Sequence, residues 1–312
     1  MTIKTFQPQE KIIIPPQPDF KKIELSDRLL LKSILSRFPQ RISGFTFATL
    51  FSWNPVYQYE WASCGPETLL ISCKPTPETA RHFLQPVGNF EPAAQALLLA
   101  NLEKRDYPTK IFGVSKDFIR QYPAFVAHFD VKNDPALANY IYRAKDLATL
   151  AGKFYAKKRN MIAQARKLYD WTVHPLTPEN SGECLVALAR VDDNDPKEKS
   201  AVITAVKNFA ALDQKGLLIK IDGKPVAFSI FEALYPETAV THFEKADRHY
   251  KGLYQIVNQE SAKMLVTAGF SLINREEDMG IAGLHQAKHS YGPSEIIPAY
   301  TLVFNSFSRT YL

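Results

Sequence analysis

The sequence predicts a mixed α/β fold organised as two tandem domains. The chain has 312 residues, and at roughly 100–200 residues per domain this length suits two domains. Its C-terminal third alternates strand and helix patterns in the order hairpin, strand, helix, strand, helix, strand, which is typical of mixed sheets flanked by helices. Hydrophobic residues make up 46% of the chain and charged residues 22%, so the disordered and fibrous classes are excluded.

Residues 1–25 are predicted to form an extended lead-in, because Pro15, Pro16 and Pro18 oppose a helix. The stretch 26–38 then begins with capping residues, continues with leucine and isoleucine at helical spacing, and is followed by a proline. We therefore expect the first helix of the N-terminal domain in this stretch.

A pair of strands is predicted over residues 57–64 and 67–74, with a turn between them at Gly65-Pro66. Helical patterns follow over residues 77–85, 91–105 and 115–122. The last of these begins with a serine cap and is closed by a proline.

A strand beginning at Asn139 is predicted to run into a long helix, because apolar residues recur on one helical face as far as Tyr169. Residues 171–178 contain two prolines and are predicted to be a linker, so we place the domain boundary there. The N-terminal domain then spans residues 26–175 and the C-terminal domain residues 176–312.

The C-terminal domain is predicted to begin with a helix-rich stretch over residues 179–212, broken by a polar loop. Asp222-Gly223 lies between two apolar runs and predicts a hairpin over residues 216–234. The following elements are a strand over 238–247, a helix over 250–270, a short strand from 271, a short helix over 281–292 and a last strand over 295–304.

The formal net charge of +6 and the sequence pI of about 9.0 favour anionic partners such as nucleic acid, anionic lipid or a phosphorylated small molecule. The same charge, spread over the chain, also suits plain solubility. The three cysteines form no CxxC pair, which excludes a disulfide framework and a zinc-finger pattern. No signal peptide or membrane-spanning apolar stretch is present, so the sequence predicts a cytoplasmic protein with at most peripheral membrane contact.

Two blocks of the sequence carry a resemblance to a known family. Residues 242–259 (HFEKADRHYKGLYQIVNQ) and 273–293 (INREEDMGIAGLHQAKHSYGP) resemble the C-terminal domain of phosphatidylglycerol lysyltransferases and its stand-alone bacterial relatives. Residues 47–57 and 147–160 fit the same family, and the resemblance spans about residues 20–310. It implies two tandem GNAT-like domains with a groove between them. It also implies transfer of an aminoacyl group from aminoacyl-tRNA to a lipid hydroxyl, although many soluble members have no assigned substrate.

The sequence departs from the family and from ordinary GNAT enzymes at three points. The membrane-spanning flippase portion of the lysyltransferases is absent, and His285 stands in a segment where the family tends to have an arginine. The RxxGxG/A loop of acetyl-CoA-dependent GNAT enzymes is also absent, because the equivalent turn has the single glycine Gly252. One glycine is a poor cradle for CoA phosphates, which argues against acetyl-CoA as donor.

Asn274 to Asp278 are five consecutive polar residues directly after a predicted strand. We expect Arg275 to hold a phosphate or carboxylate bidentately, and Asn274 and Glu276 to bind substrate. Asp278 is a candidate proton acceptor. The alternative is a solvated loop in which Asp278 is a helix N-cap.

The preceding strand has a second polar set. Alternation puts His242 and Glu244 on one face of the strand and Lys245 and Asp247 on the other. We expect Glu244 to accept a proton or bind an amine, and the other three to bind substrate. The alternative is an edge-strand salt bridge.

Donor binding is expected at the start of the helix that follows, where Tyr250, Lys251 and Gly252 precede free N–H groups. Lys158 and Arg159 lie in an earlier helix and are expected to line a groove for the tRNA acceptor end or a phosphate. The alternatives are a helix entry in which the glycine allows close packing, and a solvated basic helix face.

Near the C-terminus, Lys288 is expected to bind an anion or pair with a carboxylate, and Tyr291 to protonate the leaving oxygen or sulfur. The alternative is a basic last helical turn, which the helix dipole favours. His285 and His289 are spaced for metal chelation, but no glutamate follows the first and no third ligand is evident, so no metal is predicted.

The sequence therefore predicts an aminoacyl or acyl transferase without a tightly bound cofactor, using aminoacyl-tRNA or acyl-CoA as co-substrate. Its expected partners are tRNA and an anionic lipid or small-molecule acceptor. Two alternatives remain open: a non-catalytic protein that binds anionic lipid or RNA, and an acetyl-CoA-dependent N-acetyltransferase.

Overall fold

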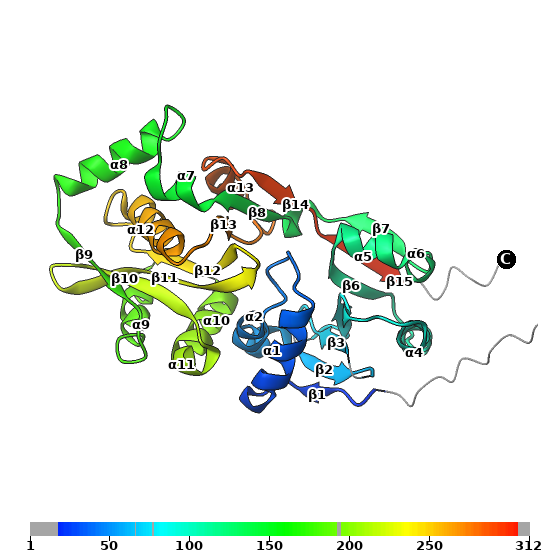
Figure 1. The fold of residues 1–312 in the computed structure, drawn as a ribbon. Coiled ribbons are helices and arrows are strands. Elements are labelled where there is room, and N and C mark those ends of the chain that lie inside the picture. Colours follow the sequence, from blue (N-terminus) through cyan, green and yellow to red (C-terminus); the bar gives the residue numbers. More distant parts are fainter. Residues whose placement is uncertain (1–17, 66, 77, 192–194, 305–312) are drawn as a thin grey trace, which may run out of the picture.

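The computed structural model describes residues 18–65, 67–76, 78–191 and 195–304. Within these ranges the chain forms two mixed sheets, one of eight strands and one of seven, with helices on their faces (Figure 1). The predicted mixed α/β fold class is confirmed. Residues 1–17 of the predicted lead-in lie outside the described ranges.

The first sheet has the strand order β1-β2-β3-β4-β6-β15-β7, and β5 also pairs with β3. Its strands are β1 (Lys21–Lys22), β2 (Glu60–Ser63), β3 (Thr68–Cys73), β4 (His82–Leu84), β5 (Val87–Gly88), β6 (Thr109–Val114), β7 (Asp130–Asn133) and β15 (Tyr300–Phe304). The predicted strand pair over residues 57–64 and 67–74 is confirmed, because β2 and β3 pair antiparallel.

The second sheet has the strand order β14-β8-β13-β12-β11-β10-β9. Its strands are β8 (Asn139–Arg143), β9 (Trp171–Pro175), β10 (Lys215–Ile221), β11 (Lys224–Tyr235), β12 (Thr238–Ala246), β13 (Leu272–Asn274) and β14 (Glu295–Ile297). The predicted hairpin is confirmed: β10 and β11 pair antiparallel through Asp222 and Gly223, which both have positive φ.

Helices cover both sheets (Figure 1). They are α1 (Arg28–Arg37), α2 (Phe47–Ser52), α3 (Asn54–Tyr57), α4 (Pro92–Glu103), α5 (Lys116–Gln121), α6 (Pro123–Val126), α7 (Ala144–Thr149), α8 (Ala156–Arg166), α9 (Glu183–Leu188), α10 (Pro196–Lys207), α11 (Phe209–Leu212), α12 (Leu253–Thr267) and α13 (Ala282–His289). Short 3-10 turns lie at Leu25–Asp27 and Pro135–Leu137. Buried residues of α7, α8 and α12 share one core with the second sheet, and those of α9, α10 and α11 lie mostly in another.

The two halves of the chain exchange strands. β8 precedes all other strands of the second sheet in sequence and pairs there with β13 and β14. β15 ends the described chain and lies in the first sheet between β6 and β7, as the red strand in Figure 1 shows. The predicted domain boundary near residue 175 stays a prediction. β8, which precedes it, lies in the second sheet, and β15, which follows it, lies in the first.

Helices α1 to α3 connect the two sheets. Trp53, between α2 and α3, stacks on Phe243 of β12 with ring centroids 6.4 Å apart. The backbone N–H of Ser43 donates to the Asn139 side chain of β8 over 2.8 Å. One hydrophobic cluster accordingly contains residues of α1, α2 and the first sheet together with Ile141 and Ile297 of the second.

Four local predictions were wrong, three of them where strand pairing decides the structure. The predicted helix over residues 77–85 is instead β4, and the predicted linker over 171–178 contains the edge strand β9. The predicted long helix is split into α7 and α8, because the chain turns left-handed at Leu150 with φ of 49°. The predicted last strand over 295–304 is two strands, β14 and β15, in different sheets.

Candidate active site

The strands β12 and β13 run parallel and then diverge. They pair only from Thr238 to Val240, opposite Leu272 to Asn274. β12 continues to Ala246, whereas β13 ends at Asn274 and a loop follows. We call this divergence the fork, formed by residues 241–246 of β12 and the loop 275–281.

A β-bulge opens the fork. Ile230 of β11 pairs with Phe243, and the next residue, Phe231, pairs with Thr241, so His242 is the extra residue on β12. A bulge takes the backbone of its extra residue out of the ladder and redirects its side chain. The bulge also interrupts the predicted alternation of side chains between the two faces of β12, and His242 and Glu244 have different partners.

His242 lies between two carboxylates. Its Nε2 is 2.8 Å from Glu232 and its Nδ1 is 3.0 Å from Glu276, and its side chain is 3% exposed. Burial opposes the charged form, but the hydrogen bonds to both glutamates outweigh it and raise the pKa of His242 to about 10. The imidazole is therefore protonated at neutral pH and holds two carboxylates together.

Arg275 and Glu244 form a buried ion pair, with 2.8 Å between Nη2 and Oε1. The Asn258 side chain of α12 donates to the other Glu244 oxygen over 3.2 Å. The Arg275 guanidinium also lies 5.7 Å from the ring centre of Tyr142 and 5.1 Å from that of Tyr291. Burial lowers the pKa of Arg275, but the Glu244 charge outweighs it and raises the value above its usual range.

Lys288 reaches from α13 into the loop of the fork. Its ammonium donates to the carbonyl oxygens of Arg275 and Glu276. Burial and the nearby Arg275 charge lower the pKa of Lys288 to about 8. Burial and the Glu276 charge raise the pKa of the neighbouring Glu277 to about 7. The two groups therefore titrate close to neutral pH.

Asp278 lies buried under α13. Its Oδ2 accepts from the Tyr140 hydroxyl over 2.6 Å and lies 2.7 Å from Nδ1 of His285, and its Oδ1 accepts from the Gly280 N–H over 2.9 Å. Burial raises the pKa of Asp278, but these hydrogen bonds outweigh it and lower the value. Asp278 is thus held as an anion.

Of the remaining predicted substrate ligands, Lys245 belongs to the fork, and Asn274 and Asp247 flank it. Asn274 is buried and bonds Asn139 and the backbone of Arg41. Lys245 bonds Glu198 of α10 over 2.6 Å, and Asp247 lies 2.8 Å from Nδ1 of His249. These contacts join the fork to its surroundings, and their predicted roles as substrate ligands stay predictions.

The predicted donor residues divide into two groups. Lys158 donates to Ser290 over 2.7 Å and lies 4.0 Å from the ring centre of Tyr291, next to the fork. Arg159 instead donates to the carbonyl oxygens of Leu150 and Gly152, so it closes the turn after α7.

The start of α12 packs against α8. A Cβ on Gly252 would lie 2.7 Å from the Met161 carbonyl oxygen, so only glycine allows this approach. The Lys251 carbonyl accepts from the Tyr169 hydroxyl, and the Tyr250 ring packs edge-on to that of Tyr169. The predicted role of this turn in donor binding stays a prediction.

Sequence reasoning missed several residues of the site: Tyr140, Tyr142, Glu232, Asn258 and Glu277. Glu277 lies in the predicted polar block 274–278 but was given no role, whereas the other four come from β8, β11 and α12, and no local spacing connects them to that block. Two signals were available. Glu232 is a charge at the end of an apolar hairpin strand, and Asn258 is a polar residue on the apolar face of a helix.

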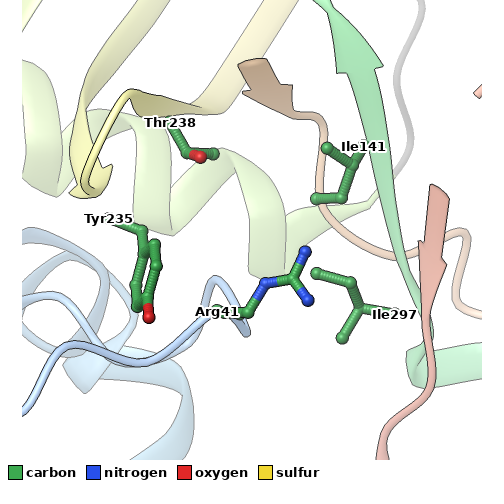
Figure 2. Close-up of a pocket in the computed structure, with 5 residues that line it drawn as sticks. All are labelled: Arg41, Ile141, Tyr235, Thr238 and Ile297. Carbon is green, nitrogen blue, oxygen red and sulfur yellow. The ribbon is translucent and has the colours of Figure 1, made fainter. Parts of the chain in front are cut away.

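A small pocket is lined by Arg41 and by four residues of the second sheet (Figure 2). The Arg41 side chain lies next to Ile141 of β8 and Ile297 of β14. Tyr235 and Thr238 lie on the opposite side of the pocket. Arg41 also binds Glu295 through both terminal nitrogens, over 3.0 and 2.5 Å. Arg41 is therefore a member of an ion pair, and none of the five lining residues belongs to the fork.

Within residues 18–65, 67–76, 78–191 and 195–304, no group of three or more His, Cys, Asp or Glu side chains lies close enough together to hold a metal ion. A search of the same residues finds no helix with the length and apolar character needed to cross a membrane.

The fold has relatives of known structure. A conserved protein of unknown function from Bacteroides thetaiotaomicron is 32% identical, with a TM-score of 0.83 over 93% of this chain and 100% of that one. The L-PGS structure from Bacillus licheniformis has a TM-score of 0.63 at 14% identity, over 90% of this chain and 92% of that one. A tandem GNAT protein of the clavulanic acid biosynthesis pathway has a TM-score of 0.52 at 12% identity, over 93% and 99% of the two chains. The predicted tandem GNAT-like fold is confirmed.

An uncharacterized protein of Mycoplasmoides gallisepticum is 26% identical over 170 residues, and the match spans 52% of this chain and 54% of that protein. The model of the family "Phosphatidylglycerol lysyltransferase, C-terminal" matches residues 35–303. That range contains the fork, all of its charged residues and all strands of the second sheet. Family and fold together make this an acyltransferase-like protein, and the chain belongs to the phosphatidylglycerol lysyltransferase C-terminal family.

Proposed function

We propose that the chain is an aminoacyltransferase, which moves an aminoacyl group from aminoacyl-tRNA to a hydroxyl of a lipid or small-molecule acceptor at the fork. The observation that carries this proposal is the bulge at His242 beside the diverging end of β13. A bulge leaves backbone N–H groups outside the ladder, and such groups stabilise the oxyanion of an acyl-transfer intermediate.

The charges around the fork support an anionic donor or acceptor. The protonated His242 is a buried cation, Arg275 and Lys288 are partly buried cations, and Lys158 lies at their edge. Two of these cations, His242 and Arg275, pair with carboxylates, so positive and negative side chains lie close together at the fork. An aminoacyl ester of tRNA has both a cationic amine and an anionic phosphate backbone, which suits such a site.

The start of α12 argues for aminoacyl-tRNA over acetyl-CoA. A GNAT enzyme that uses CoA binds its phosphates at a glycine-rich helix start. Here the corresponding turn has the single glycine Gly252, whose backbone lies against α8. The family description names a lysyl group and phosphatidylglycerol, and for this chain both are part of the proposal.

The proposal also includes where the reaction takes place. We place it in the cytoplasm, where the donor is made, with peripheral contact to a membrane if the acceptor is a lipid. We further propose that no cofactor is tightly bound, because acyl transfer from an ester needs only an oxyanion site and a proton acceptor.

The test is a binding panel at fixed salt, because basic proteins bind polyanions without specificity. Thermal shift and filter binding would compare aminoacylated tRNA, uncharged tRNA, acetyl-CoA and phosphatidylglycerol vesicles. The variant Lys158→Ala has a matched control in Lys157→Ala, which removes the same charge from the adjacent exposed position.

Tighter binding of charged than of uncharged tRNA, weakened several-fold by Lys158→Ala but not by Lys157→Ala, is the expected result. Stabilisation by acetyl-CoA alone would favour an N-acetyltransferase instead. Equal binding of charged tRNA, uncharged tRNA and anionic vesicles, with no transfer of the aminoacyl group, would favour a non-catalytic anion-binding protein.

A further inference from the structure

Acyl transfer needs a group that takes the proton from the attacking nucleophile, and the carboxylates predicted from the sequence are poorly placed for this. Glu244 has both oxygens engaged, by Arg275 and Asn258, and its side chain is 10% exposed. The Asp278 side chain is 3% exposed, and its two oxygens have three partners. A carboxylate held as an anion by several donors is a weak base.

Tyr291 does not fill this role either. It is buried, and burial raises the pKa of its hydroxyl far above neutral. Lys288 is committed to two backbone carbonyls of the fork loop. Each of these groups is therefore a structural partner in the fork.

His285 differs from all of them. It lies on α13 with its Nδ1 2.7 Å from Asp278 and 3.2 Å from the Tyr140 hydroxyl, and its side chain is 59% exposed. Among the described residues, the hydrogen bonds and the ion pair of His285 all involve Nδ1, and none involves Nε2. One ring nitrogen is thus anchored to a buried carboxylate and the other faces solvent.

We propose that His285 is the general base of the acyl transfer and that Asp278 is the positioning residue that fixes its tautomer. The proposal rests on the proposed function. Asp278 accepts the Nδ1–H of His285, which leaves the lone pair of Nε2 free to take a proton. The Tyr140 hydroxyl donates to the same carboxylate oxygen and so holds Asp278 toward the imidazole.

The pair of His285 and Asp278, which we call the dyad, adjoins the fork through Tyr140. The Tyr140 backbone pairs with Arg275 and Glu276 of the fork loop, and the Lys288 ammonium lies 5.6 Å from the centre of its ring. Asp278 lies in the same loop, three residues after Arg275. An acceptor bound at the fork can therefore place its hydroxyl near α13.

The reaction balances without another reagent. Nε2 of His285 takes the proton of the acceptor hydroxyl as that oxygen bonds to the carbonyl carbon of the aminoacyl ester. The bond between this carbon and the ester oxygen of the donor then breaks. The imidazolium returns the proton to the departing oxygen, so one ester bond replaces another and His285 is again neutral.

Three ionisable groups face His285. Asp278 faces it from the fork loop, Tyr140 faces it from β8, and His289 lies one turn further along α13 with ring centroids 4.3 Å apart. The Asp278 anion stabilises the imidazolium that forms when Nε2 takes the proton.

The first measurement tests the dyad without any substrate. Nitrogen-15 NMR of the histidine-labelled full chain, assigned with His285→Gln, reports which ring nitrogen of neutral His285 is protonated. We expect a proton on Nδ1 and a bare Nε2. Asp278→Asn should shift the proton to Nε2, because the new amide can donate to Nδ1. A wild-type His285 with its proton on Nε2 would overturn the proposal.

The second measurement uses the donor and acceptor found for the proposed function. His285→Gln should lower kcat/KM by about 100-fold or more, and Asp278→Asn should lower it with a flattened acid limb of the pH profile. His289→Gln, on the same exposed helix face, should stay within a few-fold of wild type. Full activity of His285→Gln would overturn the base role. Absence of transfer by the wild-type chain would contradict both the proposed function and the role of His285 as a base. The tautomer measurement would still show whether Asp278 fixes the proton of His285 on Nδ1, because it needs no substrate.

Discussion

At the scale of single residues, His242 links the fork to the pH dependence of stability. Its pKa is raised to about 10 in the folded chain, against about 6.5 for a histidine in an unfolded chain. Because the folded value is the higher one, its stabilising effect is complete below the unfolded value and is lost as pH rises toward 10.

We therefore predict that His242→Gln lowers the free energy of unfolding by about 3 kcal/mol at pH 6, and by much less at pH 10. Urea unfolding of both proteins at a series of pH values measures this difference. Glu277 and Lys288 also titrate in this range, so the difference between the two proteins is the quantity to follow. A constant difference across the range would mean that the pKa of His242 is the same in the folded and unfolded chains, which would contradict the prediction.

The buried pair of Arg275 and Glu244 gives a second prediction at this scale. Removing one partner leaves the other charge unpaired in the interior, at a cost of about 3–5 kcal/mol. Arg275→Met and Glu244→Gln should each be strongly destabilising, and the double variant should be less destabilised than the sum of the two. A double-mutant cycle of unfolding free energies measures this coupling, and additive effects would contradict the pairing.

At the scale of elements, Gly252 fixes how α12 packs on α8. Both Gly252 and Gly269 have positive φ, but a Cβ would meet the Met161 carbonyl only at Gly252, and nothing lies within 4 Å at Gly269. Gly269→Ala therefore tests the backbone conformation alone, and Gly252→Ala tests conformation plus close packing.

Gly252→Ala should be more destabilising than Gly269→Ala by about 1–3 kcal/mol, which is the usual cost of overpacking. Thermal or urea unfolding of the two variants measures the difference. Equal destabilisation would mean that α8 moves away freely, and it would reopen the start of α12 as a donor-binding turn.

Elements governed by local chemistry could be predicted from the sequence. The hairpin at Asp222-Gly223 and the helix α12 need only their turn residues and periodicity. In contrast, β4 is a strand because Phe83 pairs with Ser72 on one side and Ile111 on the other. Such long-range pairing overrides local propensity, and no window of the sequence contains it.

The candidate site divides in the same way. Arg275 and Lys288 were found because they lie in contiguous polar blocks of the sequence. The partners of Asp278 and His242 could not be identified in this way, because Tyr140 and Glu232 come from other strands. The bulge at His242 was also invisible, since the register of two strands decides it.

At the scale of the whole molecule, the exchanged strands make the two sheets depend on each other. We predict that a chain ending at residue 293 loses the cooperative unfolding of both sheets, because β14 pairs with β8 in one and β15 with β6 and β7 in the other. A peptide of residues 294–304 should restore it. Circular dichroism melting with and without the peptide measures this, and a shortened chain that melts like wild type would contradict it.

The position of β15 also has a consequence for synthesis on the ribosome. β6 and β7 leave the exit tunnel long before β15, the strand that lies between them in the sheet. All strands of the second sheet are translated in that interval. Throughout that interval both nascent strands present unpaired edges, which attract other chains. Efficient production of this protein therefore depends on how fast translation proceeds and on chaperones that shield those edges until the last strand emerges.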